Sequence, residues 1–432
     1  MNKSTSSDDH EQEIVDGDKK LKKANVIAFN LLEKDFKYIK IFIAHKVVYY
    51  YVDSLGHYKK LFYDEFKVIL TKVLRFYTKD LFSSNLLERV WKKILVADQC
   101  LVGSPEANSG YAAFPNGLLD LKIFEFIEHN PEIFTTHGNS FDYDPNVTDT
   151  PHFNLFLEIL SCGHKDREMY LRSLINCVVM SRIYLQIVIY IFGPGATGKS
   201  QLTSLLRVLV GDSSTISTTL NALSSDQFEA NNLKNMKMVL VNDSPGIIKD
   251  SSLVKAYSGN DELRGRVIYN QGITSIVPTG IIVIVGNEPI TTDGADSGNA
   301  VGHRLRIYET EKISESRIPL IYTKDGVSGG VLAEELPGIF NSIVNMDGKQ
   351  VEECVMYYEN KVPSFQNTLH AVNKRINSVY EWSSEELEPL DKRTRLGCYA
   401  TDKKDLKLTV GGFLFPTYVE WCKRKNLKRR IL

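Results

Sequence analysis

The chain has 432 residues, which is more than one hydrophobic core ordinarily organises, so we expect two or three domains. Hydrophobic residues make up 43% of it and charged residues 24%, which is typical of soluble globular proteins. The formal net charge of −1 excludes a general electrostatic attraction to nucleic acid, so any basic binding surface has to be local.

The first 24 residues are mostly polar and predict a disordered tail without a signal peptide. Asp16 and Asp18 resemble a metal-binding aspartate pair, but no strand pattern surrounds them, so we interpret them as solvated charge. Residues 174–192 are the most hydrophobic run, and the polar residues within it favour a buried helix and strand over a membrane span. The six cysteines form no CxxC pair, which fits a reducing compartment without a zinc site. We expect a cytoplasmic location, or the interior of an organelle if the gene is organelle-borne.

Residues 25–150 predict an N-terminal accessory region of mixed α and β structure. Within it, 47–53 read as a strand, 63–77 and 86–95 as helices, and the later Pro- and Asn-rich part, from NGLLDL to the end, as loop and boundary. Residues 151–183 carry two hydrophobic stripes at helical spacing, with Gly163 between them, and predict a helical lead-in.

Short hydrophobic runs between polar turns fill residues 184–345 and predict a parallel sheet that is buried on both faces. Residues 346–432 carry two further helical stripes and predict a small helical C-terminal domain. The expected fold class is therefore α/β.

Residues 193–200, GPGATGKS, match the GxxxxGK[ST] pattern of a phosphate-binding loop. Glycines let backbone N–H groups converge on phosphate oxygens, and the start of the following helix adds a positive dipole end. Lys199 would reach the β- and γ-phosphates, and the Ser200 hydroxyl would ligate Mg²⁺. The strand before and the helix after the motif disfavour a chance glycine turn. We expect a nucleoside triphosphate to be held by Gly193, Pro194, Gly195, Ala196, Thr197, Gly198, Lys199, Ser200 and Gln201.

Two polar side chains follow later strands of the expected sheet. Asp243 comes after the strand 238–241, where it could hold the metal or polarise water, and Asn287 comes after 281–285, where it could hold the attacking water. Each residue alone is also compatible with an ordinary turn. Their spacing favours function, because Lys199 to Asp243 and Asp243 to Asn287 are both 44 residues apart, which fits crossover units of a parallel sheet.

Arg304 and Arg306 follow in the sequence AVGHRLRI. An arginine offered to a neighbouring subunit's nucleotide would stabilise transition-state charge, and a solvated basic turn is the alternative.

Together these motifs resemble the superfamily 3 helicases within the AAA+ ATPases, and more narrowly the helicase half of the phage, plasmid and poxvirus primase-helicases. Similarity extends over about residues 110–432. The segments that carry it, besides the phosphate loop, are NGLLDL at 116–121, KAYSGNDELRGRVIYNQ at 255–271, ELPGIFNSIV at 335–344 and YVEWCKRKNLK at 418–428.

The resemblance implies an AAA+ P-loop ATPase domain at 184–345, a winged-helix-like domain at 346–432, and ATP with Mg²⁺ as cofactors. It implies a homo-hexameric ring that binds single-stranded DNA. The family's primase is either a further partner on a separate chain or has been lost. In the nucleotide site, the loop and Lys199 would bind phosphate, Asp243 would act in catalysis and bind the metal with Ser200, and Asn287 would be the sensor. Arg304 would be the intersubunit finger. Lys255, Arg264 and Arg266 would contact DNA through a hairpin.

Three departures from the family pattern leave alternatives open. The second motif offers one carboxylate, Asp243, where the family usually has an acidic pair or a glutamate, and either Arg304 or Arg306 could be the finger. Arg264 and Arg266 are equally compatible with a solvated strand face, and the basic run 423–430 is a second, peripheral candidate for DNA. No primase domain is visible.

The leading hypothesis is an ATP-driven, ring-forming DNA helicase or translocase that replicates a mobile element. The alternatives are a DNA-binding initiator or loader whose ATPase switches assembly, and a degenerate, non-hydrolysing DNA-binding scaffold.

Overall fold

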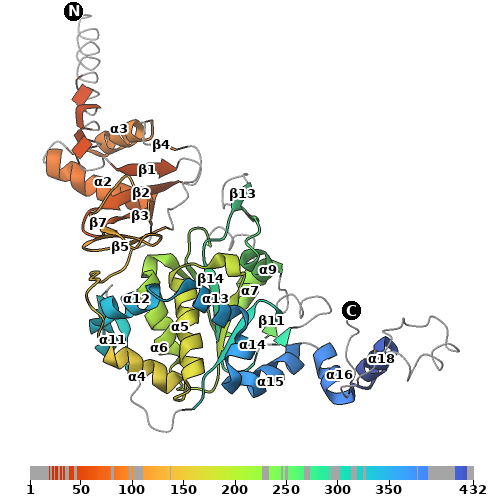
Figure 1. Cartoon of the computed structure of the whole chain (residues 1–432). Coiled ribbons are helices and arrows are strands. Elements are labelled where there is room, and N and C mark those ends of the chain that lie inside the picture. Colours follow the sequence, from red (N-terminus) through yellow and green to blue (C-terminus); the bar gives the residue numbers. More distant parts are fainter. Residues whose placement is uncertain are drawn as a thin grey trace, which may run out of the picture. The chain divides into compact units, whose positions relative to one another are not determined.

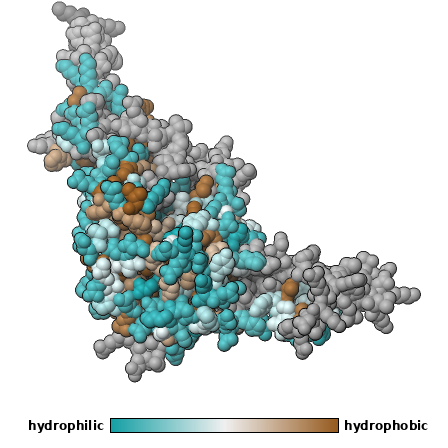
Figure 2. Space-filling model, in the orientation of Figure 1, coloured by the Kyte–Doolittle hydropathy of each residue, from teal (hydrophilic) through white to brown (hydrophobic). Residues whose placement is uncertain are grey.

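The computed structural model forms two compact units, Met1–Tyr143 and Asp144–Leu432 (Figure 1). The structure describes residues 19, 22–23, 25–27, 30–31, 33–34, 38–42, 46–78, 82–96, 100–101, 110–136, 138–225, 233–244, 247–248, 252–266, 273–289, 291–292, 302–312, 319–324, 327–376, 378–387 and 414–425. Within these ranges, no helix combines the length and the apolar character that a membrane crossing needs. The face of the molecule in Figure 2 is largely hydrophilic, with hydrophobic residues scattered over it.

The first unit contains a four-stranded sheet in the order β3-β2-β1-β4, against which two helices pack. Phe66, Leu70 and Leu74 recur every four residues along one helix, so they share one face and are fully buried. The expected strand and both expected helices are present. The elements are β1 (Ile39–Phe42), β2 (Val47–Val52), β3 (His57–Phe62), β4 (Cys100–Leu101), α2 (Tyr63–Thr78) and α3 (Ser84–Ile94).

A smaller antiparallel sheet of β5 (Tyr111–Phe114), β6 (Gly117–Asp120) and β7 (Phe126–Ile127) completes the first unit. The sequence NGLLDL, which we expected to be loop, forms β6 instead. Its residues Leu118 and Leu119 are fully buried, so hydrophobic burial overrides the turn-forming Pro-Asn pair before them.

The second unit is built on a five-stranded parallel sheet in the order β16-β8-β14-β10-β9. In chain order along the sheet this reads 5-1-4-3-2. Every residue of β8 and β14 is buried, which confirms the expected sheet covered on both faces. The strands are β8 (Val188–Phe192), β9 (Thr215–Thr218), β10 (Met238–Ser244), β14 (Ile281–Gly286) and β16 (Leu305–Glu309).

Helices from before and after the sheet segment pack together beside it (Figure 1). Helix α5 contacts α4, α6, α12 and α13, and its buried Asn176 donates a 2.7 Å hydrogen bond to the carbonyl of Ile343. Gly163 has a φ of 74° between α4 and α5, as the break between the two stripes predicted. The bounds are α4 (Pro151–Leu160), α5 (Lys165–Val179), α6 (Lys199–Val210), α12 (Leu336–Val344) and α13 (Gly348–Met356).

Shorter elements surround the sheet. They are η2 (Ile183–Leu185), η3 (Asp212–Ser214), α7 (Leu220–Ser225), α9 (Ser252–Ser258), α11 (Val331–Glu334), the parallel pair β11 (Ile247–Ile248) and β15 (Thr291–Thr292), and the antiparallel pairs β12 (Leu263–Arg266) with β13 (Ile273–Ile276) and β17 (Tyr322–Lys324) with β18 (Val327–Gly329).

The C-terminal segment is helical wherever the structure describes it: α14 (Tyr358–Lys361), η4 (Pro363–Phe365), α15 (Gln366–Ile376), α16 (Ser378–Glu386) and α18 (Leu414–Arg424). Trp382 of α16 packs with Tyr418 and Trp421 of α18. In the expected basic patch, Arg424 and Lys425 pair with acidic residues of α16, and residues 426–430 lie outside the described residues. The part of the patch that is described is therefore partly neutralised.

Lys237, at the start of β10, is only 3% exposed, and burial lowers the pKa of its ammonium group to about 8. Below that pH the folded chain carries a buried charge, which costs up to about 3 kcal/mol. Between pH 8 and 10.5, Lys237 is protonated in the unfolded chain but mostly neutral in the folded chain. Unfolding then takes up a proton, so the free energy of unfolding increases with pH and the destabilisation disappears above pH 10.5.

We predict that Lys237→Met raises the melting temperature by several degrees at pH 7 and by much less at pH 10. Differential scanning calorimetry at both pH values measures this. Lys312→Met, which changes an exposed lysine, is the matched control and should change neither value. An equal gain from Lys237→Met at the two pH values would contradict the assignment.

Candidate functional site

The glycine-rich loop connects the end of β8 to the start of α6, as the sequence predicted. Gly193 has a φ of 144°, and a Cβ placed there would lie 2.1 Å from the carbonyl oxygen of Thr310. Any side chain at this position would collide with backbone, so the loop needs a glycine to leave the strand so close to β16. Ala196 and Gly198 also have positive φ values, of 61° and 89°, before α6 begins at Lys199.

Thr310, directly after β16, stabilises the loop by hydrogen bonds to its two sides. Its backbone N–H donates to the carbonyl of Phe192 at 2.7 Å, and its hydroxyl lies 3.1 Å from the same oxygen. The Thr310 and Thr197 hydroxyls share a 2.7 Å hydrogen bond, and both side chains are 1% exposed. Sequence reasoning missed Thr310 because only the parallel pairing of β16 with β8 brings it to the loop.

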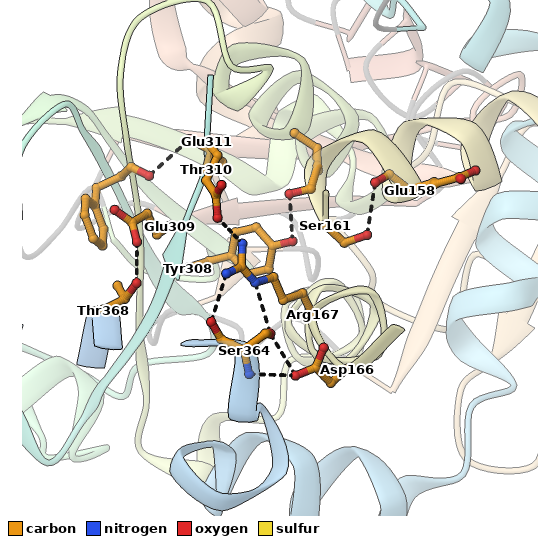
Figure 3. Close-up of polar contacts among 12 residues, drawn as sticks. Glu158, Ser161, Asp166, Arg167, Tyr308, Glu309, Thr310, Glu311, Ser364 and Thr368 are labelled. Carbon is orange, nitrogen blue, oxygen red and sulfur yellow. Dashed lines mark hydrogen bonds and ion pairs between the residues drawn. The ribbon is translucent and has the colours of Figure 1, made fainter. Parts of the chain in front are cut away.

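The residues on either side of Thr310 contact helices (Figure 3). Glu309 accepts a hydrogen bond from Thr368 of α15, and Glu311 pairs with Arg167 of α5. Because strand side chains alternate in direction, three consecutive residues can reach the loop and two helices at once.

Arg167 is nearly buried and lies at the centre of this cluster (Figure 3). Its guanidinium donates to the hydroxyl of Ser364 at 3.0 Å and to its carbonyl at 2.9 Å, and packs 4.3 Å from the ring centre of Phe365. The carboxylate of Asp166 accepts from the Ser364 hydroxyl at 2.8 Å. Burial alone would raise the pKa of Asp166, but the hydrogen bonds from Ser364 outweigh it, so the pKa lies below its usual range.

The Lys199 side chain is 8% exposed and folds along the loop. Its ammonium group donates to the carbonyl oxygens of Gly193 at 2.7 Å and of Pro194 at 2.5 Å. These contacts fix the ammonium group beside the loop, where phosphate oxygens would replace carbonyl oxygens as its acceptors.

A cavity of about 1310 Å³ extends from this loop to the neighbouring strand ends. Among the described residues, it is lined by loop residues 195–201, by Leu240 and Asn242 of β10, and by Val285, Gly286 and Asn287 at the end of β14. Asn242 and Asn287 are exposed. The structure thus brings the loop, the second-motif strand and the predicted Asn287 around one space that is large enough for a small-molecule ligand.

Asp243 lies within β10 rather than after it, because β10 continues to Ser244. The pairing with β14 shifts between Val241, opposite Ile284, and Ser244, opposite Gly286. An advance of three residues along β10 therefore matches an advance of two residues along β14, and the extra residue makes a bulge at Asn242 and Asp243. Bulges re-aim side chains beside active sites, and this one falls on the predicted acid. The Asp243 side chain is outside the described part of the chain.

A hydrogen bond from Tyr190 of β8 stabilises the turn that carries Asn287. The Tyr190 hydroxyl donates to the carbonyl of Glu288, and a Cβ on Gly286 would lie 2.6 Å from that hydroxyl. Burial, with a smaller contribution from Glu288, raises the pKa of Tyr190 well above its usual value, so the hydroxyl remains a donor. This support for Asn287 was invisible in the sequence.

The structure separates the two candidate finger residues. Arg306 is 5% exposed, donates to the carbonyls of His303 at 2.9 Å and Leu305 at 3.0 Å, and packs over Tyr358. These contacts hold the Arg306 side chain within its own chain, which favours Arg304 as the finger candidate. Arg304 directly precedes β16, at the sheet edge opposite the loop, because β16 runs parallel to β8.

The predicted DNA-contacting residues do not share one hairpin. Arg264 and Arg266 lie on β12, opposite Ser275 and Ile273 of β13, which confirms a hairpin. Residues 267–272, between the two strands, lie outside the described residues. Lys255 lies instead on α9, which contacts β12, because residues 252–258 form a helical turn before the hairpin begins. The side chains of Arg264 and Arg266 are not among those described.

Comparisons with known proteins match part of the chain to a family model and show distant structural similarity. Residues 31–162 match the family model described as "D5 N terminal like". Two solved structures of the apo A form of the NrS-1 C-terminal region are similar to this chain at 14% identity, with TM-scores of 0.44 and 0.42. They cover 80% and 76% of this chain, which matches 77% and 70% of theirs. A third apo structure of that region has 15% identity and a TM-score of 0.44, over 77% of this chain and 72% of the other.

We predict that Thr310→Val weakens Mg–ATP binding by about five- to tenfold, because the loop loses the hydroxyl that ties Thr197 to the strand end. Valine keeps the shape, so the melting temperature should fall by only a few degrees. Isothermal titration calorimetry measures the affinity. Thr368→Val is the control, because it removes a threonine hydroxyl that bonds Glu309 and does not contact the loop. If Thr368→Val weakens Mg–ATP binding by a comparable factor, the effect of Thr310→Val is not local.

Proposed function

We propose that the protein is an ATP hydrolase that drives translocation along DNA, as a superfamily 3 helicase of the AAA+ class acting in replication of a mobile element. The observation that carries this proposal is that one cavity joins the phosphate-binding loop to the ends of β10 and β14. The strand order 5-1-4-3-2, with the loop on the first strand, supports the AAA+ assignment.

ATP and Mg²⁺ are the cofactors we propose for this cavity. The residues fit them, because the loop leads into the N-terminus of α6, where free N–H groups favour phosphate, and the Lys199 ammonium group is held beside the loop. Ser200 and Asp243 would hold Mg²⁺, which would neutralise charge on the phosphates. Asn287, on the turn fixed by Tyr190, would orient the attacking water.

A ring explains the position of Arg304. The residue precedes a strand of five residues, so it is about 16 Å along the sheet from its own loop. An arginine at this edge would serve a nucleotide on a neighbouring subunit, where it stabilises transition-state charge. Homo-oligomerisation is therefore part of the proposal, with a hexamer as the expected form.

Single-stranded DNA is the proposed substrate of the β12–β13 hairpin. The net charge of −1 means that binding needs a few local cations, and Arg264, Arg266 and Lys255 are the candidates near this hairpin. The match of residues 31–162 to the D5 N-terminal-like domain, which is associated with primase-helicases, supports a role in replication. A separate primase is the further partner this implies.

The deciding experiment measures ATP hydrolysis with and without single-stranded DNA, together with displacement of a labelled strand. We expect DNA to stimulate hydrolysis, and strand displacement to require it. Lys199→Ala should abolish both activities while the protein stays folded, because removing one side chain from a loop disturbs little of the core.

Other outcomes point to the alternatives. Hydrolysis without strand displacement would favour an initiator or loader, particularly if Arg264→Ala and Arg266→Ala leave DNA binding unchanged. Absence of hydrolysis under every condition would favour a DNA-binding scaffold.

Mixing two inactive variants tests the ring. One variant, Lys199→Ala, keeps Arg304; the other, Arg304→Ala, keeps Lys199. In a one-to-one mixture, roughly a quarter of interfaces would combine an intact loop with an intact arginine, so about that fraction of hydrolysis should return. Steady-state ATPase measurements beside sizing by light scattering provide the readout. A monomer with full ATPase activity, or mixtures that stay inactive, would exclude the intersubunit role of Arg304.

A further inference from the structure

The cavity has hydrophobic lining that the phosphate chemistry does not use. Besides the loop and α6, it is lined by large hydrophobic side chains that remain open: Leu155 is 44% exposed, Leu320 54% and Tyr322 55%. Hydrophobic side chains gathered in a concave site are typical of the surface against which a flat organic ring packs.

This hydrophobic wall has a fixed position relative to the phosphate loop. Gln201, in the first turn of α6, accepts a 2.8 Å hydrogen bond from the backbone N–H of Ile321 through its side-chain oxygen. The carbonyl of Leu320 accepts in turn from the N–H of Leu332. The helix that begins at the loop therefore also anchors the wall, so Gln201 contributes by positioning it.

The side chain of His152 lines the cavity together with these hydrophobic residues. It lies at the start of α4, where the carboxylate of Glu335 accepts from the backbone N–H groups of His152 and Phe153, both at 2.9 Å. The same carboxylate is 2.6 Å from Nδ1 of His152. An ionised carboxylate only accepts hydrogen bonds, so Nδ1 carries the proton.

The tautomer decides what His152 can offer to a ligand. In the neutral form of the ring, a proton on Nδ1 leaves Nε2 as a bare acceptor. Nε2 makes no hydrogen bond to any residue within the described ranges, and the side chain is 49% exposed although Glu335 behind it is nearly buried. In this form, His152 adds to the cavity lining an acceptor that is fixed in orientation and open.

We propose that His152 is a specificity residue that accepts a hydrogen bond from the exocyclic amino group of adenine, and so selects ATP over nucleotides without an amino group at that position. The inference rests on the proposed nucleotide site and names its base. Guanine presents an oxygen acceptor where adenine presents an amino donor, so its carbonyl would oppose the Nε2 lone pair. The exposed leucines and Tyr322 would pack against the ring in either case.

The test compares Mg–ATP with the triphosphate of purine riboside, which has the same ring without the amino group. Titration calorimetry on the full chain should show ATP binding about fivefold more tightly, with GTP weaker than ATP. In His152→Phe, which keeps an aromatic ring and loses the acceptor, ATP and the purine analogue should bind equally.

Leu155→Ala is the matched control, because it removes hydrophobic contact from the same wall. It should weaken both ligands by the same factor and leave their ratio unchanged. Equal binding of the two ligands to the wild type, or an unchanged ratio in His152→Phe, overturns the role of His152 while the nucleotide site stands. A ratio that collapses equally in Leu155→Ala also overturns it. Binding of no nucleotide at all overturns the proposed function itself.

Discussion

The close approach of Gly193 to Thr310 is the contact on which the site depends. The parallel strands β8 and β16 end side by side, and the chain leaves β8 at Gly193. A Cβ at this position would lie only 2.1 Å from the carbonyl oxygen of Thr310, directly after β16. Thr310 then supplies the hydrogen bonds that hold the departing loop, through the carbonyl of Phe192 and the hydroxyl of Thr197. The loop's shape is thus set by the sheet beneath it, and its glycines only permit that shape.

Buried polar groups connect the sheet to the helices around it. Arg167 links the end of β16 to Ser364, and Glu335 caps α4 while orienting His152. Each group is nearly buried and has its partners, which is the condition under which buried charge specifies an arrangement. Such contacts bring segments 144 to 197 residues apart in sequence to the same site.

Local patterns were enough to predict the elements that carry the chemistry. The loop, its strand and helix, the buried sheet and the helices α2 to α5 follow from hydrophobic periodicity and glycine placement. Long-range pairing was not predictable in this way. The bulge at Asp243 depends on how β10 meets β14, and Thr310, Tyr190 and Glu335 act only through residues far away in sequence.

The same limit applies to residues that the sequence left open or misplaced. Arg304 and Arg306 look equivalent in sequence, yet Arg306 is buried against Tyr358 while Arg304 is only half-buried. The family resemblance placed Lys255 on the hairpin with Arg264 and Arg266, although a helix ends between them. NGLLDL has a turn-forming start, but its two leucines are buried in a small sheet. In each case the tertiary environment outweighed the local signal.

Strand β16 gives the proposed ring a physical route between sites. It carries Arg304 before its first residue and Thr310 after its last, and its pairing with β8 is continuous from Leu305 to Glu309. Arg306 anchors its start to nearby carbonyls and to Tyr358. A paired strand resists stretching, so a displacement of Arg304 by a neighbour's nucleotide would move the whole strand. Because Thr310 touches the phosphate loop directly, that movement would reach the chain's own nucleotide without any intervening flexible segment.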